Sequence, residues 1–414
     1  MNGPDPIATA LDTLVQAGSL AGAATLVWRA GRVVQTASVG WRDIEAGLPV
    51  ERDTLFRLAS MTKPITAVAA LRLLEEGRFA LSDPITRWAP EFAEMRVLRS
   101  PTGPLDQTEP AARPITFNDL LTHRSGITYG SSQAGPLESA YDAALGSAID
   151  SQLAPDDWIG RLAALPLLDQ PGAAFHYGNS TDLLGLLLAR MDGAPLSEVL
   201  ARRIFGPLGM RDTSFSVPQD KRGRRAQMYG FDDTGRLTPR PCGPQRGGRA
   251  GVLLAERSDD QAFASGAAGL WSTLDDYLAF ARLFLGDGAV DRVRLLRPET
   301  LALMTTNHLT DIQRAQAEML GLPTFTAHGF GLGVAIVLDP AKADPWRCRG
   351  SVGTVGWPGA YGGWWQADPT DGSVMILLAH NVFELDQFEQ GIGLGVYSAI
   401  SRFHSLASAW PRQD

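Results

Sequence analysis

The sequence is poor in the residues that form disulfide frameworks and metal sites. Its 414 residues include two cysteines, Cys242 and Cys348, and six histidines. The cysteines are far apart, in polar or Gly-, Pro- and Arg-rich surroundings, so we expect both thiols to be unpaired. No Cys/His spacing typical of zinc sites and no H-E-x-x-H pattern occurs. We therefore expect no metal ion and no other cofactor.

Long apolar runs and basic clusters are also missing. No stretch is long enough to cross a membrane. The first basic residue is Arg29, whereas a secretory signal starts with a basic segment and continues with an apolar one. The formal net charge of −8 offers no attraction to nucleic acid or to an anionic membrane surface. These absences predict a cytoplasmic protein whose partners are neither nucleic acid nor membranes, and they give no indication of the oligomeric state.

The strongest chemical signal is the tetrapeptide Ser60-Met61-Thr62-Lys63, which opens an apolar helical stretch that ends at Gly77. Residues three apart lie on one helix face, so the Ser60 hydroxyl and the Lys63 amine can meet. The start of a helix also favours a developing anion. A serine nucleophile needs an adjacent base, and a lysine in an apolar site can be that base because desolvation lowers its pKa. S-x-x-K is short, however, and also occurs by chance in solvated surface segments.

Strand patterns lie at both ends of the chain and helical patterns lie mostly in the middle. The strand patterns occupy 23–28, 33–39, 332–338, 362–367 and 374–380. The helical patterns occupy 5–20, 386–409 and most of 81–205. We therefore predict an α+β fold, in which N- and C-terminal segments form one antiparallel sheet that is flanked by helices.

The same pattern predicts one catalytic unit over residues 1–414. Its α/β region is expected to comprise 1–80 and 261–414, with 81–260 as an inserted, mostly helical region. Residues 216–260 are polar and rich in Gly and Pro, which is typical of a long loop. We expect the site to lie between the two regions, where pockets preferentially form.

Two further motifs accompany the S-x-x-K helix, a Y-G-N turn at 177–179 and a W-P-G triplet at 357–359. In this order the three motifs resemble those of the serine β-lactamase and penicillin-binding-protein superfamily. The stretches 121–126 and 207–213 resemble the class C β-lactamase and family VIII carboxylesterase branch in particular. The resemblance covers residues 20–400 and implies a β-lactamase/transpeptidase-like fold with acyl-enzyme chemistry.

The resemblance implies a role for each motif residue. Ser60 is expected to attack a carbonyl carbon, with Lys63 and Tyr177 as the pair that handles the proton. The backbone N–H groups of Ser60 and Ala360 are expected to form the oxyanion hole. Asn179 is expected to hold Lys63 or the substrate through its amide, and it can also act as a helix cap.

The third motif departs from the superfamily in a way that bears on the substrate. Penicillin-recognising members generally begin this motif with a cationic residue that meets the substrate carboxylate, whereas this chain has Trp357. We expect Trp357 and Gly359 to bind a neutral, apolar group, as family VIII esterases resemble this chain in having such a tryptophan. Core packing is the alternative role of Trp357. Gly178 in place of the usual Ser, and the unusual Pro358, leave the geometry of both motifs open.

The sequence therefore predicts a serine carboxylesterase that cleaves small, neutral esters through a Ser60 acyl-enzyme. A β-lactamase, D-amino-peptidase or acyltransferase with the same residues is the alternative, and a catalytically silent binding protein is a third possibility. The absence of a G-x-S-x-G elbow argues against an α/β-hydrolase. His123 and His176 are expected to be structural, because the proton transfer is assigned to other residues.

Overall fold

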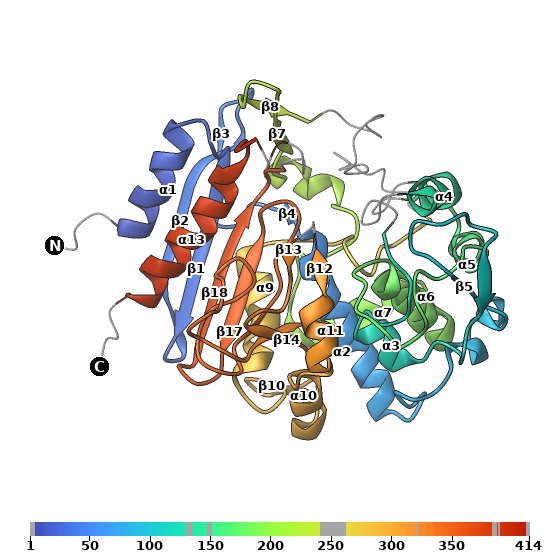
Figure 1. The fold of residues 1–414 in the computed structure, drawn as a ribbon. Coiled ribbons are helices and arrows are strands. Elements are labelled where there is room, and N and C mark those ends of the chain that lie inside the picture. Colours follow the sequence, from blue (N-terminus) through green and yellow to red (C-terminus); the bar gives the residue numbers. More distant parts are fainter. Residues whose placement is uncertain are drawn as a thin grey trace.

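A computed structural model of the protein describes residues 5–129, 135–146, 151–240, 262–319, 322–382, 387 and 390–410. Its main feature is an eight-stranded antiparallel sheet with the strand order β14-β15-β16-β17-β18-β1-β2-β3 (Figure 1). The strands are β1 (Gly22–Arg29), β2 (Arg32–Asp43), β3 (Leu48–Pro49), β14 (His328–Phe330), β15 (Ala335–Val337), β16 (Val355–Gly356), β17 (Trp364–Asp368) and β18 (Ser373–Ala379).

The N- and C-terminal parts of the chain meet at the centre of this sheet. Ala23 of β1 pairs with Ala379 of β18, and Trp28 pairs with Val374. Because side chains alternate between the two faces of a strand, Leu26 packs into the inner core while Val27 packs into the outer one. The prediction of an α+β fold with a sheet built from both ends of the chain is therefore confirmed.

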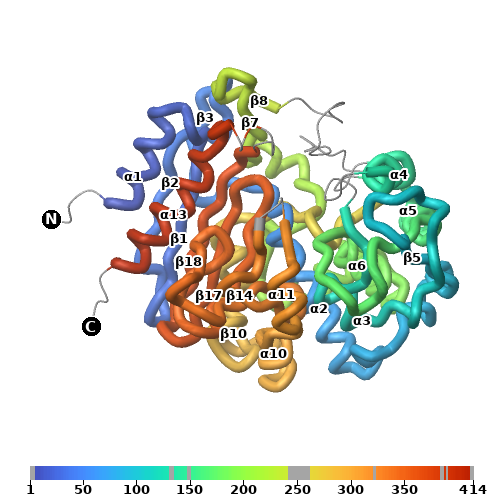
Figure 2. Tube along the Cα trace, viewed as in Figure 1, coloured from blue at the N-terminus to red at the C-terminus, as the bar shows by residue number. Residues whose placement is uncertain are grey.

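The two terminal helices cover the outer face of the sheet. Helix α1 (Pro6–Gln16) begins at Asp5, whose carboxylate accepts a hydrogen bond from the backbone N–H of Ile7 at 2.8 Å. Its buried residues recur at helical spacing and pack with α13 (Leu394–Ser408) in one apolar cluster. Figure 2 shows both helices, blue and red, side by side along the sheet.

Helix α2 (Thr62–Glu75) lies between the sheet and a helical region, and it is buried nearly all round. Its apolar side chains belong to one continuous core that also includes Ile376 of the sheet and Leu187 of α6 (Ser180–Asp192). The other helices of that region are α3 (Phe117–Leu121), α4 (Pro136–Leu145), α5 (Pro155–Ala163), α7 (Leu196–Leu200) and α8 (Gly206–Leu208). The start of α2 thus lies where the sheet and the helical region meet.

Residues 216–240, which we predicted as part of a long loop, are more ordered than expected. They contain the 3-10 turn η6 (Gln219–Arg224) and a hairpin of β7 (Tyr229–Phe231) and β8 (Leu237–Pro239). The hairpin forms because β7 is buried and Gly235, with a φ of 78°, permits the turn. Residues 241–260, and with them Cys242, lie outside the described residues.

Smaller elements complete the fold. They are β4 (Phe56–Arg57), β5 (Arg96–Leu98), β6 (Thr108–Pro110), β9 (Trp271–Ser272), α9 (Leu274–Ala281), β10 (Ala289–Val290), β11 (Val293–Arg294), α10 (Pro298–Met304), α11 (Asp311–Gln316), β12 (Glu318–Met319) and β13 (Leu322–Pro323). No helix in the described ranges is both long and apolar enough to cross a membrane.

Candidate active site

Ser60 lies in a 3-10 turn (Ala59–Met61) that leads directly into α2. The preceding residue, Ala59, is fully buried and has a φ of 44°, in the left-handed region that is unfavourable for a residue with a Cβ. Tertiary packing holds this conformation, since Ala59 contacts a small cluster that includes Met228 and Tyr361. Ser60 itself is partly exposed, so its hydroxyl remains accessible at the start of the helix.

The amine of Lys63 is buried and has three polar partners. Its Nζ atom is 3.3 Å from Ser60 Oγ, 3.2 Å from Tyr129 Oη and 3.1 Å from the carbonyl oxygen of Ala267. An ammonium group can donate to all three, and a neutral amine can donate to two and keep its lone pair for the Ser60 proton. The arrangement therefore accommodates Lys63 before and after a proton transfer from Ser60.

Tyr129 is the site residue that the sequence did not indicate. It lies on the segment between α3 and α4, outside the three motifs, and its hydroxyl accepts from Lys63. The tyrosine is only partly covered, but desolvation of its hydroxyl raises the pKa well above the ordinary value, and the Asp182 carboxylate raises it further. Tyr129 is thus a phenol that can both accept from and donate to the groups around Lys63.

The Y-G-N turn supports the segment that carries Tyr129. A Cβ on Gly178 would lie 2.3 Å from the carbonyl carbon of Thr128 and 2.7 Å from the backbone nitrogen of Tyr129, so only glycine allows this approach. The Asn179 amide donates to the Thr128 carbonyl at 3.1 Å. The close contact explains why this position of the motif is occupied by glycine in this chain.

Asn179 does not hold Lys63 in this structure, which differs from one of the two roles we expected. Within the described ranges no hydrogen bond joins the two side chains, because Lys63 directs its amine to Ser60, Tyr129 and Ala267. Asn179 occupies the N-cap position of α6, but its side chain makes no capping hydrogen bond with the described part of the chain. A contact of Asn179 with the substrate stays a prediction.

Tyr177 meets Lys63 through its ring and Trp357 through its hydroxyl. Lys63 Nζ is 4.6 Å from the centroid of the Tyr177 ring, while the indole N–H of Trp357 donates to Tyr177 Oη at 2.9 Å. Because that oxygen accepts from the indole, its own proton remains available to another acceptor. Trp357 is 1% exposed and packs against Phe330 with the ring centroids 5.3 Å apart, so its aromatic face is largely covered by the protein.

Ala360, the second residue predicted for the oxyanion hole, lies in a tight turn that packs against the segment before Ser60. Gly359 donates to the Gly363 carbonyl at 2.7 Å, and a Cβ on Gly359 would lie 2.4 Å from the carbonyl oxygen of Leu58. Glycine is therefore required for this loop to approach the segment before Ser60. Ala360 is exposed, and its N–H forms no hydrogen bond to any described residue. Its pairing with the Ser60 N–H stays a prediction.

The two histidines near the motifs have structural contacts. The His123 ring packs against Tyr177 with the centroids 4.8 Å apart, and burial and the Lys63 charge lower its pKa well below the ordinary value. His176 Nε2 lies 3.2 Å from the Asp169 carboxylate, and this hydrogen bond lowers the pKa of Asp169. Among the described residues, no three His, Cys, Asp or Glu side chains are grouped as ligands for a metal ion.

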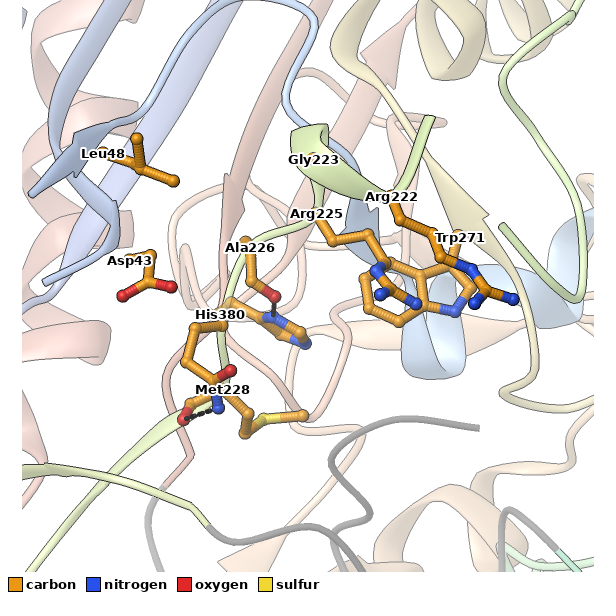
Figure 3. Close-up of a pocket in the computed structure, with 10 residues that line it drawn as sticks. Asp43, Leu48, Arg222, Gly223, Arg225, Ala226, Met228, Trp271 and His380 are labelled. Atoms are coloured by element: carbon orange, nitrogen blue, oxygen red, sulfur yellow. Dashed lines mark hydrogen bonds between the residues drawn. The ribbon is translucent and has the colours of Figure 1, made fainter. Parts of the chain in front are cut away.

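Figure 3 shows a separate cavity of about 230 Å³. Arg225, Met228, Trp271 and His380 are among its lining residues, and none of the predicted site residues is. Met228 belongs to the same apolar cluster as Ala59. His380 Nδ1 bonds the Ala226 carbonyl at 2.8 Å, and burial lowers the pKa of His380 to about 3, so the ring is neutral. The cavity is distinct from the cluster around Lys63.

Comparison with known proteins identifies the family. The family model described as Beta-lactamase matches residues 7–392. Protein Rv1367c of Mycobacterium tuberculosis (strain ATCC 25618 / H37Rv) is 46% identical over 369 residues, which cover 89% of this chain and 88% of that protein. Esterase EstB of Burkholderia gladioli is 33% identical over 384 residues, covering 90% and 89%.

A solved structure is similar over nearly the whole chain. EstCE1, described as a hydrolase with promiscuous acyltransferase activity, has a TM-score of 0.78 at 27% identity and covers 96% of this chain and 97% of its own. The chain therefore belongs to the β-lactamase family, as a serine hydrolase with the β-lactamase/transpeptidase-like fold and with esterases among its homologues.

Proposed function

We propose that the protein is a carboxylesterase that cleaves small, neutral esters through a covalent acyl intermediate on Ser60. The observation that carries the proposal is the 3.3 Å contact between Lys63 Nζ and Ser60 Oγ at an accessible helix start. A buried amine next to an accessible hydroxyl is the arrangement that activates a serine nucleophile. The similarity to Esterase EstB supports an ester as the substrate.

The reaction would begin with attack of Ser60 Oγ on the ester carbonyl, while its proton passes to Lys63. The oxyanion would accept hydrogen bonds from the backbone N–H groups of Ser60 and Ala360. When the carbon–oxygen bond to the alcohol breaks, the proton held by Lys63 would return to the leaving alkoxide through a tyrosine hydroxyl. Tyr177 is the tyrosine that the motif predicts, and Tyr129 is the one whose hydroxyl is bonded to Lys63.

Water would then hydrolyse the acyl-enzyme and release the acid, by the same proton transfers in the opposite order. A water molecule near the same groups gives its proton to the Lys63 amine and attacks the acyl carbon, and Ser60 leaves with the proton restored. The same residues therefore serve both half-reactions, as acyl transfer requires.

Trp357 supports a neutral substrate. Its indole stands at the position where penicillin-recognising relatives generally carry a cation, and it carries no charge to pair with a carboxylate. Its N–H is used by Tyr177 rather than directed to a ligand. We therefore expect short neutral esters to react faster than nitrocefin or a D-Ala-D-Ala peptide.

The test compares these three substrate classes on the wild-type protein and on Ser60→Ala. We expect the wild type to hydrolyse short p-nitrophenyl esters. In Ser60→Ala the hydrolysis rate should fall by about 10⁶-fold or to the background rate, because no neighbouring residue can replace the nucleophile. Ser405→Ala, on the exposed face of α13, is the matched control and should keep full activity. Ester hydrolysis by Ser60→Ala at the wild-type rate would refute the proposal, and preferential cleavage of nitrocefin would refute the substrate class.

Acyl transfer to an alcohol is a second candidate activity, because the similar structure EstCE1 is described as a hydrolase with promiscuous acyltransferase activity. The acyl-enzyme can pass its acyl group to any nucleophile that reaches it. Adding methanol to the ester assay distinguishes the two outcomes, since transfer yields a methyl ester and hydrolysis yields the free acid.

A further inference from the structure

The third partner of the Lys63 amine is a backbone carbonyl, and the structure shows what holds it in place. Ala267 belongs to a turn at 266–268, which directly follows Ser265 and precedes β9, far from Lys63 in sequence. On the α2 side, the Thr66 hydroxyl donates to the Gly266 carbonyl at 2.7 Å. On the α6 side, Asp182 Oδ1 accepts from Ser265 Oγ at 2.6 Å and from the Ala267 backbone N–H at 3.1 Å.

Asp182 is a buried carboxylate that accepts hydrogen bonds from Ser265 and from the backbone of this turn. It lies in the first turn of α6 and is 1% exposed. Burying a carboxylate is unfavourable unless hydrogen bonds compensate, and the positive end of the helix dipole offsets part of that cost. The two bonds to Ser265 and Ala267 connect α6 to residues more than 80 positions later in the chain.

A second buried aspartate shows how this differs from ordinary helix capping. Asp119 occupies the same third position of α3, is 2% exposed, and closes a capping box with Thr116 while pairing with Arg113. Such a carboxylate stabilises its own helix start. The hydrogen bonds of Asp182 to Ser265 and Ala267 instead fix the residue whose carbonyl accepts from Lys63.

We propose that Asp182 is a positioning residue for Lys63: by holding Ala267, it aims the Lys63 amine at Ser60 Oγ and Tyr129 Oη. The proposal rests on the proposed function of Ser60 as nucleophile and Lys63 as its base. The backbone N–H of Ala267 donates to Asp182, and the carbonyl of Ala267 accepts from Lys63. The orientation of Ala267 therefore sets where the Lys63 amine lies. The negative charge of Asp182 also favours the phenol form of Tyr129.

The experiment measures the rate and the amplitude of Ser60 labelling by a fluorophosphonate in wild type, Asp182→Ala, Asp182→Asn and Ser265→Ala. A positioning defect slows each molecule, so the rate constant falls while the amplitude stays complete. A folding defect removes molecules, so the amplitude falls while the rate constant stays. We expect a rate loss of about 10- to 100-fold in Asp182→Ala, because small misplacements of a catalytic group have effects of this size.

The other variants should show smaller losses in the rate constant of Ser60 labelling. Asp182→Asn retains an oxygen that can accept both hydrogen bonds, so its rate should lie between those of wild type and Asp182→Ala. Ser265→Ala removes one bond of the two and should show a smaller loss, and it provides the test if Asp182→Ala does not fold. In ester assays the loss should appear in kcat, with KM unchanged.

Asp119→Ala and Asp119→Asn are the matched controls, since they remove a carboxylate of equal burial at the same helix position. They should lower the melting temperature and leave the labelling rate constant unchanged. Wild-type labelling rates in Asp182→Ala, or in Ser265→Ala where Asp182→Ala does not fold, would overturn the inference, as would equal rate losses in the Asp119 variants. Absence of any Ser60 labelling in the wild type would instead refute the proposed nucleophile, and the inference with it.

Discussion

At the scale of single residues, the site is organised around three hydrogen bonds between side chains. Lys63 is bonded to Ser60 and Tyr129, and Tyr177 is bonded to Trp357. The ring of Tyr177 lies against the Lys63 amine, which connects the Lys63 hydrogen bonds with the Tyr177–Trp357 pair. In this arrangement Trp357 contributes a hydrogen-bond donor that orients the Tyr177 hydroxyl.

Trp357→Phe tests that contribution. The substitution keeps an aromatic ring in the core and removes the indole N–H, so the Tyr177 hydroxyl loses the donor that orients it. We expect kcat for a short ester to fall about tenfold, the equivalent of one hydrogen bond, with little change in KM.

Trp364→Phe is the matched control for this variant. Trp364 is also fully buried, and its indole N–H has no hydrogen-bond partner among the residues that the structure describes. Its replacement should leave kcat unchanged. If Trp357→Phe had wild-type kcat, the hydrogen bond to Tyr177 would have no part in turnover.

At the scale of elements, the Y-G-N turn and the segment before α4 form one unit. Gly178 lies in direct contact with the backbone of Thr128 and Tyr129, and Asn179 bonds the Thr128 carbonyl. The Y-G-N turn therefore positions the Tyr129 hydroxyl next to Lys63, and it also contains Tyr177. This contact predicts that substitutions at Gly178 and Tyr129, which are distant in sequence, have coupled effects on kcat.

Gly178→Ser is expected to displace Tyr129 and to lower kcat about tenfold or more, because a side chain would overlap the Thr128 backbone. If the loss arises through Tyr129, adding Gly178→Ser to Tyr129→Phe should cost little more than Tyr129→Phe alone, since effects on one shared contact do not add. Kinetics of both single variants and the double variant measure this coupling. Gly160→Ser, where a Cβ has open space, is the control. Fully additive losses would contradict the account.

The anchoring of η6 predicts a dependence of stability on pH. Hydrogen bonds from Arg224, with desolvation opposing them and Lys221 adding to them, lower the pKa of Asp212 from 3.8 to about 2. A carboxyl with a lowered pKa stabilises the folded state above its unfolded pKa, and this contribution is lost as the pH falls through the folded pKa. The loss due to Asp212 should therefore occur between about pH 4 and about pH 2.

Urea unfolding across this pH range measures the effect. The wild-type midpoint should fall more steeply towards low pH than that of Asp212→Asn, which is less stable at neutral pH but lacks this titration. Asp157→Asn removes an exposed carboxylate that has no ion pair among the described residues, and its profile should parallel the wild type. Parallel profiles for wild type and Asp212→Asn would contradict the role of the Arg224 pair.

At the scale of the whole molecule, the sheet brings the two ends of the chain together and thereby places the motifs. The third motif precedes β17, which is paired with β18, while β1 leads through β2 and β3 to the Ser60 turn. Helix α2 then runs into the shared core between the sheet and α6. The S-x-x-K and Y-G-N motifs thus lie at the starts of two helices, α2 and α6, that share this core.

The sequence predicted the parts of this arrangement that local patterns encode. The strands β1, β2, β15, β17 and β18 were predictable from their β-branched and apolar runs, and Ser60 and Lys63 from helical spacing. The short strands β3, β14 and β16 were not predicted, because two or three residues carry too little pattern. Tyr129 was not predictable, because its contact with Lys63 spans 66 residues and depends on the close approach at Gly178. The partner of Asn179 could not be predicted either, since a motif names a residue but does not show which neighbours compete for its amide.

The most direct test of the central claim is mass spectrometry of the protein trapped during turnover of a short ester. We predict a mass increase of one acyl group, located on the peptide that contains Ser60 and absent in Ser60→Ala. Rapid turnover with the acyl group on another residue, or with an identical adduct in Ser60→Ala, would contradict the account.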